Sequence, residues 1–127
     1  MILIDTHVLI WFMFDDTQLS ARALSAIREE DKVFVSIASL WEIAIKKSIG
    51  KLDIDVSGEE LADKCAEAGI DILPIEPKHL DYLSELPNIH NDPFDRLIIS
   101  QAVSENLSLV SRDEKIAKYP NVKVIWD

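Results

Sequence analysis

Short apolar runs alternate with longer helical patterns along nearly the whole chain. The apolar runs lie at 2–4, 33–35, 70–73, 107–110 and 122–125, and the helical patterns lie at 19–30, 39–49, 58–69, 77–86 and from 93 onward. Continuously apolar strands connected by helices are typical of a parallel sheet buried on both faces. The pattern therefore predicts an α/β fold, with one domain over residues 1–127 and a central parallel sheet of about five strands covered by helices on both faces.

Composition excludes several classes of site. The chain has 127 residues, which suits one domain, and its single cysteine, Cys65, excludes an intramolecular disulfide and a multi-cysteine zinc site. Only three glycines are present, too few for a glycine-rich phosphate loop. The formal net charge of -10 argues against a protein that holds nucleic acid by bulk electrostatics, because such domains are usually basic.

The first fourteen residues are apolar, but they do not have the pattern of a secretory signal. They lack a basic segment and a small-residue cleavage site, and they contain Asp5 and His7. No other stretch approaches the roughly 20 apolar residues that cross a membrane. We therefore expect a cytoplasmic protein with no membrane partner.

Four acidic residues lie where a parallel α/β sheet places its ligands, outside the carboxyl ends of the strands. Asp5 follows the first apolar run, Asp113 follows the fourth, and Glu42 and Asp95 lie near the starts of two helical patterns. Taken singly, each has a structural explanation. Asp is a good helix cap, and Ser39 with Glu42 has the spacing of a capping box.

The four acids together are harder to explain by capping alone. Carboxylates gathered at one edge of a sheet repel one another unless a cation joins them or some are protonated. Oxygen ligands of this kind suit Mg²⁺ or Mn²⁺, whose usual further partner is a substrate phosphate. The acidic set therefore predicts metal-dependent phosphodiester hydrolysis without a cysteine or serine nucleophile.

Four blocks of the sequence resemble the PIN-domain family. They are IDTH at 4–7, SIASLWEI at 36–43, HNDPFDR at 90–96 and LVSRD at 109–113, and the resemblance that they carry covers nearly the whole chain. The resemblance is greatest to the VapC-like ribonuclease toxins of toxin–antitoxin modules, in the subgroup with the Asp-Pro-Phe-Asp-Arg motif.

The resemblance implies a fold, an activity and partners. It implies a sheet ordered 3-2-1-4-5 and an endoribonuclease in which a metal-activated water hydrolyses RNA. It also implies a homodimer and a cognate antitoxin in a bacterial or archaeal cytoplasm. The metal site would hold one or two Mg²⁺ or Mn²⁺ ions on Asp5, Glu42, Asp95 and Asp113, with Asp92 as an additional acid and with Thr6 and Ser111 as supporting hydroxyls.

Other residues have competing interpretations. Candidate contacts to substrate phosphates are Arg96, Arg112, Lys46 and Lys47, although each could instead pair with a neighbouring carboxylate. We expect the three histidines, His7, His79 and His90, to be structural. Two other functions fit parts of the pattern: a receiver-type Mg²⁺-binding signalling domain, and a PIN-like module that binds RNA without cleaving it.

Overall fold

Five parallel strands form one sheet in the computed structural model, which describes residues 1–127. The strands are β1 (Ile2–Ile4), β2 (Val33–Ser36), β3 (Ile70–Leu73), β4 (Ser108–Val110) and β5 (Val124–Ile125). Their order is β3-β2-β1-β4-β5, and every neighbouring pair is parallel. This confirms the predicted sheet and its order, with β1 at the centre between β2 and β4.

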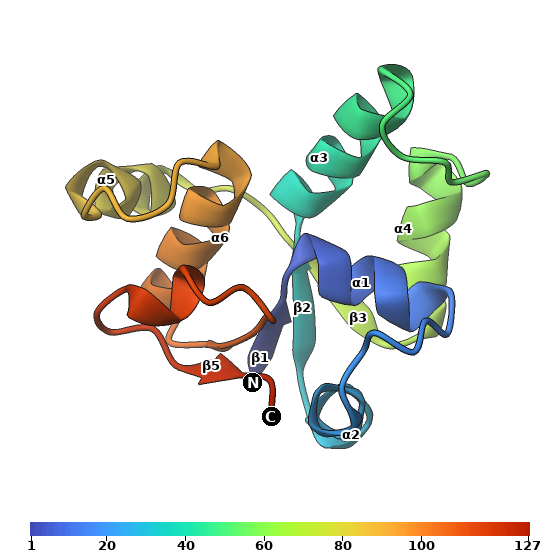
Figure 1. The fold of residues 1–127 in the computed structure, drawn as a ribbon, viewed down its shortest axis with the longest axis horizontal. Helices are drawn as coiled ribbons and strands as arrows, with labels where there is room; N and C mark the ends of the chain where they lie inside the picture. The colour runs from blue at the N-terminus through green and yellow to red at the C-terminus, as the bar shows by residue number, and fades with distance from the viewer.

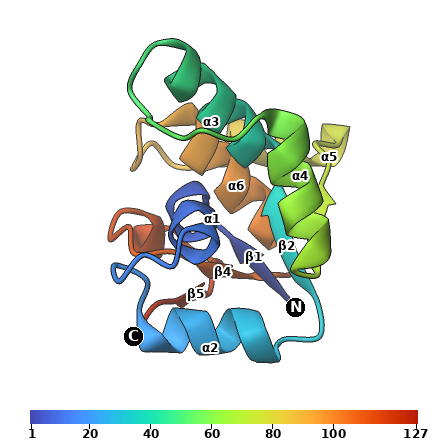
Figure 2. The ribbon, with the colours of Figure 1, turned by 90° about the vertical axis from the view of Figure 1, so that its right-hand side faces the viewer.

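Six α-helices and one short 3-10 helix connect the strands. They are α1 (Thr6–Met13), α2 (Ala21–Glu29), α3 (Ile37–Ser48), α4 (Gly58–Glu67), α5 (Pro77–Glu85), α6 (Pro93–Ser104) and η1 (Ile116–Lys118). Helices α1, α2 and α4 lie on one side of the strands, and α5 and α6 lie on the other (Figure 1). Figure 2 shows α2 near both termini, at the end of the molecule opposite to α3. None of these helices has both the length and the apolar character needed to cross a bilayer.

The alternation of side chains along β1 divides the core into two clusters. Ile2 and Ile4 pack in a cluster with residues of α1, α2, α3 and α4, whereas Leu3 packs in a second cluster with residues of α5 and α6. All three side chains are at most 2% exposed. Because successive strand residues point to opposite faces, an apolar residue at every position is what a strand covered on both faces requires.

The helix starts differ from the sequence prediction in three places. The helix predicted over 19–30 begins after its cap, Ser20, and α3 begins after Ser36, so that Ser39, where that helix was expected to start, lies inside it. The sequence pattern gave no span for α1, which begins directly after Asp5. A capping box opens α4, since the Ser57 hydroxyl accepts from the amide of Glu60, whose carboxylate accepts from the amide of Ser57.

The topology brings α1, α3 and α6 to the same edge of the sheet. Helices α1 and α3 start where β1 and β2 end, and the amide of Asp5 donates to the carbonyl of Val110 at the end of β4. Helix α6 leads into β4 by running back across the sheet, so its first turn also lies at the carboxyl ends of the strands. Residues far apart in the sequence therefore meet at one edge.

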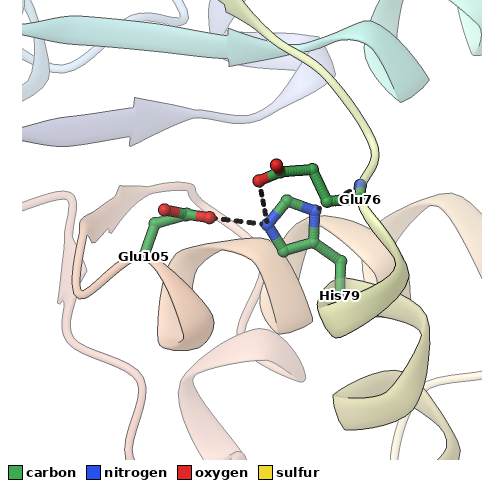
Figure 3. A group of neighbouring side chains, drawn as sticks. All are labelled: Glu76, His79 and Glu105. Atoms are coloured by element: carbon green, nitrogen blue, oxygen red, sulfur yellow. Dashed lines mark hydrogen bonds and ion pairs between the residues drawn. The ribbon is translucent and has the colours of Figure 1, made fainter.

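A buried histidine joins the start of α5 to the end of α6. The imidazole of His79 is fully buried and lies between the carboxylates of Glu76 and Glu105 (Figure 3). Its Nδ1 accepts from the amide of Glu76 at 3.0 Å, and its Nε2 is 2.8 Å from Oε2 of Glu105. The exposed Lys78 ammonium reaches the same Glu105 oxygen at 2.9 Å. The Lys78 ammonium already balances the charge of Glu105, so the cluster needs no bound metal ion to explain it. Its role is to link α5 to the end of α6.

We expect the buried partner of Glu105 to matter more for stability than the exposed one. His79→Ala removes a packed ring and two hydrogen bonds, and should lower the free energy of unfolding by about 2 kcal/mol. Lys78→Met should change it far less, because solvent screens an exposed ion pair. Urea denaturation at neutral pH measures both, and equal losses would contradict this account.

Candidate acidic site at the carboxyl edge of the sheet

A cleft of about 240 Å³ opens at the edge where α1, α6 and the end of β4 meet. Three carboxylates line it, from Asp5, Asp95 and Asp113. The remaining lining residues are His7, Trp11 and Arg112. The structure thus brings three of the four predicted acids to one cleft, together with one cationic side chain.

Asp5 is held in place by hydrogen bonds to its carboxylate. It caps α1, and its Oδ1 accepts from the amide of Val8 at 2.9 Å. Burial raises its pKa above the ordinary 3.8, although hydrogen bonds from Ser111 and Val8 oppose that rise. Ser111, which also accepts from the amide of Asp113, therefore lies between two acids of the cleft. Both the capping and the site interpretations apply to Asp5.

Asp95 is a second acid of the cleft whose ionisation the structure opposes. Burial, followed by the nearby charge of Asp92, raises the pKa of Asp95 to about 7, and Asp5 and Glu42 add to the repulsion. Asp92 itself caps α6, since its Oδ1 accepts from the amides of Phe94 and Asp95 at 2.8 and 3.0 Å. The neighbouring carboxylates therefore add to the effect of burial in opposing the ionisation of Asp95.

The pKa of Asp113 is lowered, in contrast to that of Asp95. Burial would raise its pKa, but hydrogen bonds from His90 and from the amides of Lys115 and Ile116 hold the pKa of Asp113 below its ordinary value. The His90 Nε2 atom is 2.8 Å from Oδ2 of Asp113 and 3.1 Å from Oδ2 of Asp95. His90 thus lies between two of the acids, a position that the sequence analysis did not predict.

Glu42 lies behind the cleft and does not line it. Its side chain is 5% exposed, accepts from the Thr6 hydroxyl at 2.7 Å, and pairs with the Lys46 ammonium at 2.6 Å. The hydroxyl of Ser39 lies 2.9 Å from that of Thr6. Because both Glu42 oxygens have these partners and Ser39 is inside α3, the capping-box explanation of Glu42 is wrong. Thr6 and Lys46 therefore fix its carboxylate instead.

The predicted basic residues do not all face the cleft. Arg112 does, with its guanidinium 4.4 Å from the Trp11 ring centroid. Arg96 instead donates to the carbonyls of Leu86 and Pro87 and to the Tyr119 hydroxyl, and Lys47 donates to the carbonyl of Val56. In this structure the guanidinium of Arg96 supports the loop before α6.

The donor set suits a hard divalent cation. The ligand atoms of His90, Asp95 and Asp113 all lie within 4.8 Å of one another, and Asp5 lines the same cleft. Carboxylate oxygens are the preferred ligands of Mg²⁺ and Mn²⁺, and a bound cation would offset the burial and the repulsion that together raise the pKa of Asp95. The residues present therefore fit a metal site formed by Asp5, Asp95 and Asp113, with Glu42 behind them.

Comparisons with known proteins give one family and a consistent set of relatives. The family model described as the PIN domain matches residues 2–122. Ribonuclease VapC22 of Mycobacterium tuberculosis is 26% identical over 128 residues, covering 98% of this chain and 98% of that protein.

Solved structures share the fold at low sequence identity. VapBC2 from Rickettsia felis, bound to a DNA fragment from its promoter, matches with a TM-score of 0.71 and 21% identity over 100% of both chains. A toxin–antitoxin complex from Klebsiella pneumoniae matches with a TM-score of 0.67 and 20% identity, over 98% of this chain and 96% of that one. DNA-bound VapBC from Salmonella typhimurium gives 0.68 and 15%, over 98% of each chain.

The two cleft acids beside His90 should affect stability in opposite directions. Because the pKa of Asp95 is raised, its protonated form stabilises the folded protein, and this contribution is lost as the pH rises through about 7. In EDTA at pH 8, Asp95→Asn should therefore raise the free energy of unfolding, on the order of 1 kcal/mol, with a smaller gain at pH 5.

Asp113→Asn is the matched control. The lowered pKa of Asp113 means that its carboxylate stabilises the fold above its ordinary pKa, so the amide should destabilise the protein at pH 8. Urea denaturation of both variants at the two pH values tests the pair. A loss of stability in both variants at pH 8 would contradict the repulsion inferred at Asp95.

Proposed function

This chain belongs to the PIN-domain family, and we propose that it is a divalent-metal-dependent endoribonuclease that acts as the toxin of a toxin–antitoxin pair. The observation that carries the proposal is the convergence of Asp5, Asp95 and Asp113 on one cleft, although they are separated by up to 108 positions in the chain (113 − 5). Such a set of carboxylates, with no cysteine, serine or threonine among the residues that line the cleft, favours hydrolysis by an activated water.

The residues divide into those that would bind the cation and those that hold them. Asp5, Asp95 and Asp113 would bind one or two Mg²⁺ or Mn²⁺ ions, and Asp92 would add negative charge from the cap of α6. Glu42, which is buried next to the cleft, would complete the acidic set of this metal site. When bound, such an ion polarises a phosphoryl group and lowers the pKa of a water.

The protein's own groups would orient the substrate and the acids. Arg112 is the cationic side chain that lines the cleft, and its position on the Trp11 ring leaves a guanidinium able to bind a phosphate of the RNA backbone. Thr6 fixes the carboxylate of Glu42, and Ser111 contacts that of Asp5. The choice of RNA over DNA rests on the curated relative, which is named a ribonuclease.

The order of the strands argues against a receiver-type signalling domain. A receiver-type signalling domain has the flavodoxin-like order 2-1-3-4-5, whereas this sheet has the order 3-2-1-4-5. A PIN-like module that binds RNA without cleaving it has the same fold and the same acids. It differs from the proposed enzyme only in turnover, so product formation separates the two.

Partners form the second part of the proposal. The solved relatives from Rickettsia felis and Klebsiella pneumoniae are described as VapBC and as a toxin–antitoxin complex, and we extend an antitoxin partner to this chain on that ground. Helix α3 exposes one apolar stripe at four-residue spacing, Ile37, Trp41, Ile45 and Ile49, which range from 36% to 59% exposed. Stripes of this kind are typical of protein interfaces, and a homodimer remains a prediction.

We expect the purified protein to cleave RNA in Mg²⁺ or Mn²⁺ and to lose that activity in EDTA. Asp5→Asn and Asp95→Asn should each lower the cleavage rate at least about 100-fold, because loss of a neighbouring support residue alone commonly costs a metal site 10- to 100-fold. Circular dichroism should show that both variants remain folded. A gel assay with labelled RNA and a matched DNA measures the rates and the preference.

Glu114→Gln provides a charge-matched control for these variants. Glu114 follows Asp113 directly but does not line the acidic cleft, so its amide variant should retain full activity. Undiminished cleavage by both Asp variants would refute the assigned site. Metal-dependent RNA binding with no product in any preparation would favour the binding module.

Coexpression tests the partner independently of the cleavage assay. The product of a short open reading frame next to this gene should copurify with the chain and relieve the growth arrest that the chain causes alone. Growth arrest that persists despite a stable complex would contradict the antitoxin assignment.

A further inference from the structure

His90 is held in one orientation by contacts at both its backbone and its ring. Its amide donates to the Tyr119 hydroxyl at 2.7 Å, and the same hydroxyl accepts from Arg96 at 3.1 Å. Its ring Nδ1 accepts from the amide of Asp92 at 3.1 Å. The residue is 9% exposed, so its imidazole is enclosed as well as hydrogen-bonded.

These contacts determine which ring nitrogen carries the proton. A nitrogen that accepts from a backbone amide has no hydrogen of its own, so a neutral imidazole held in this way carries its proton on Nε2. The Nε2 atom of His90 is hydrogen-bonded to Oδ2 of Asp113, 2.8 Å away, and lies 3.1 Å from Oδ2 of Asp95. His90 thus presents an N–H donor to Asp113 at a position next to Asp95.

We propose that His90 is a positioning residue, which donates from Nε2 to Asp113, lies against Asp95, and so aligns the two carboxylates for the divalent cation without binding the cation itself. This inference rests on the proposed function. It assigns a role to a residue that the acidic motif alone leaves out, and it accounts for why the loop before α6 is tied to Tyr119 and Arg96.

The geometry favours a donor over a ligand. Ligation through Nε2 would require the imidazole proton to move to Nδ1, where it would face the N–H of Asp92. That arrangement would leave two donors pointing at each other in an enclosed position. Supporting donors of this kind, which orient the groups that bind a metal, commonly change metal affinity 10- to 100-fold when they are removed.

The other groups around the ring reinforce this assignment. Asp92 contacts it through its amide and not through its carboxylate, which is engaged in capping α6. The cationic Arg96 reaches the Tyr119 hydroxyl and not the acids. Nε2 of His90 is therefore the side-chain donor that the structure places between Asp95 and Asp113.

Three substitutions separate a donor at Nε2 from the rest of the ring. His90→Gln can place an amide N–H near the position of Nε2, His90→Asn reaches only the position of Nδ1, and His90→Ala removes both. Isothermal titration with Mn²⁺ should give a Kd for the Gln variant within about threefold of the wild type. The Asn and Ala variants should bind about 10- to 100-fold more weakly.

His79 supplies a matched control elsewhere in the chain. Its Nδ1 also accepts from a backbone amide and its Nε2 also faces a carboxylate, but it lies in the α5–α6 link and does not line the cleft. His79→Gln and His79→Asn should therefore change the free energy of unfolding and leave the Kd for Mn²⁺ unchanged. Equal losses of metal affinity at both histidines would reduce the role of His90 to general stability and overturn the proposal.

A spectroscopic measurement tests the protonation state directly. Nitrogen-15 spectra of the imidazole should show a protonated Nε2 and an unprotonated Nδ1 for His90, both before and after Mg²⁺ is added. Movement of the proton to Nδ1 on Mg²⁺ addition would make His90 a ligand and overturn the proposal.

The Mn²⁺ affinities of the His90 variants and of the wild type provide two further tests. An unchanged Kd in the Asn and Ala variants, or tighter binding in any of them, would also overturn the positioning role while leaving the metal-dependent nuclease intact. A wild-type protein that binds no Mn²⁺ would refute the proposed function and this inference together.

Discussion

Mutual repulsion among carboxylates at one edge of a parallel sheet is the constraint on which this structure depends. Burial and the neighbouring charges raise the pKa of Asp95 to about 7, so ionising this carboxyl group in the folded protein costs free energy. The surrounding polar groups are arranged to hold the acids in place despite that repulsion. Ser111 and a backbone amide support Asp5, while Thr6 and Lys46 support Glu42. Buried carboxylates held close together lower the stability of the folded protein relative to apolar side chains at the same positions. A bound cation would offset this loss of stability.

Two histidines in this chain have the same local geometry and different surroundings. In both, Nδ1 accepts from a nearby backbone amide and Nε2 faces a carboxylate. At His79 the carboxylate already has the Lys78 ammonium, so the cluster links two helices. At His90 the two facing carboxylates have no comparable lysine or arginine partner and belong to the cleft. The same hydrogen-bonding arrangement thus gives a structural link in one place and a support for the acidic site in the other.

The net charge of -10 first argues against a partner that is itself an anion. The structure places part of that charge in a cleft where it would bind cations, and a bound divalent ion would locally reverse the field that a phosphate meets. Only Arg112 adds positive charge to the cleft lining. Nucleic acid held in this way would depend on the metal and on a few contacts, in contrast to the nonspecific binding of a basic domain.

The sequence by itself determined the five strands, most of the helices that connect them and the edge at which the acids meet. It could do so because apolar periodicity is a local pattern and because parallel strands end at the same edge, whereas the strand order followed only from the family resemblance. The acids Asp5, Asp95 and Asp113 could be found in this way, since each follows a strand or opens a helix. Only the tertiary structure decided which side chains hold them. Asp113 is 23 residues from His90 and Thr6 is 36 residues from Glu42, so no local pattern contains these contacts, although the Lys46–Glu42 pair has local helix spacing. It also placed the cap of α3 at Ser36, whose hydroxyl accepts from the amide of Ala38, three residues before the predicted start at Ser39.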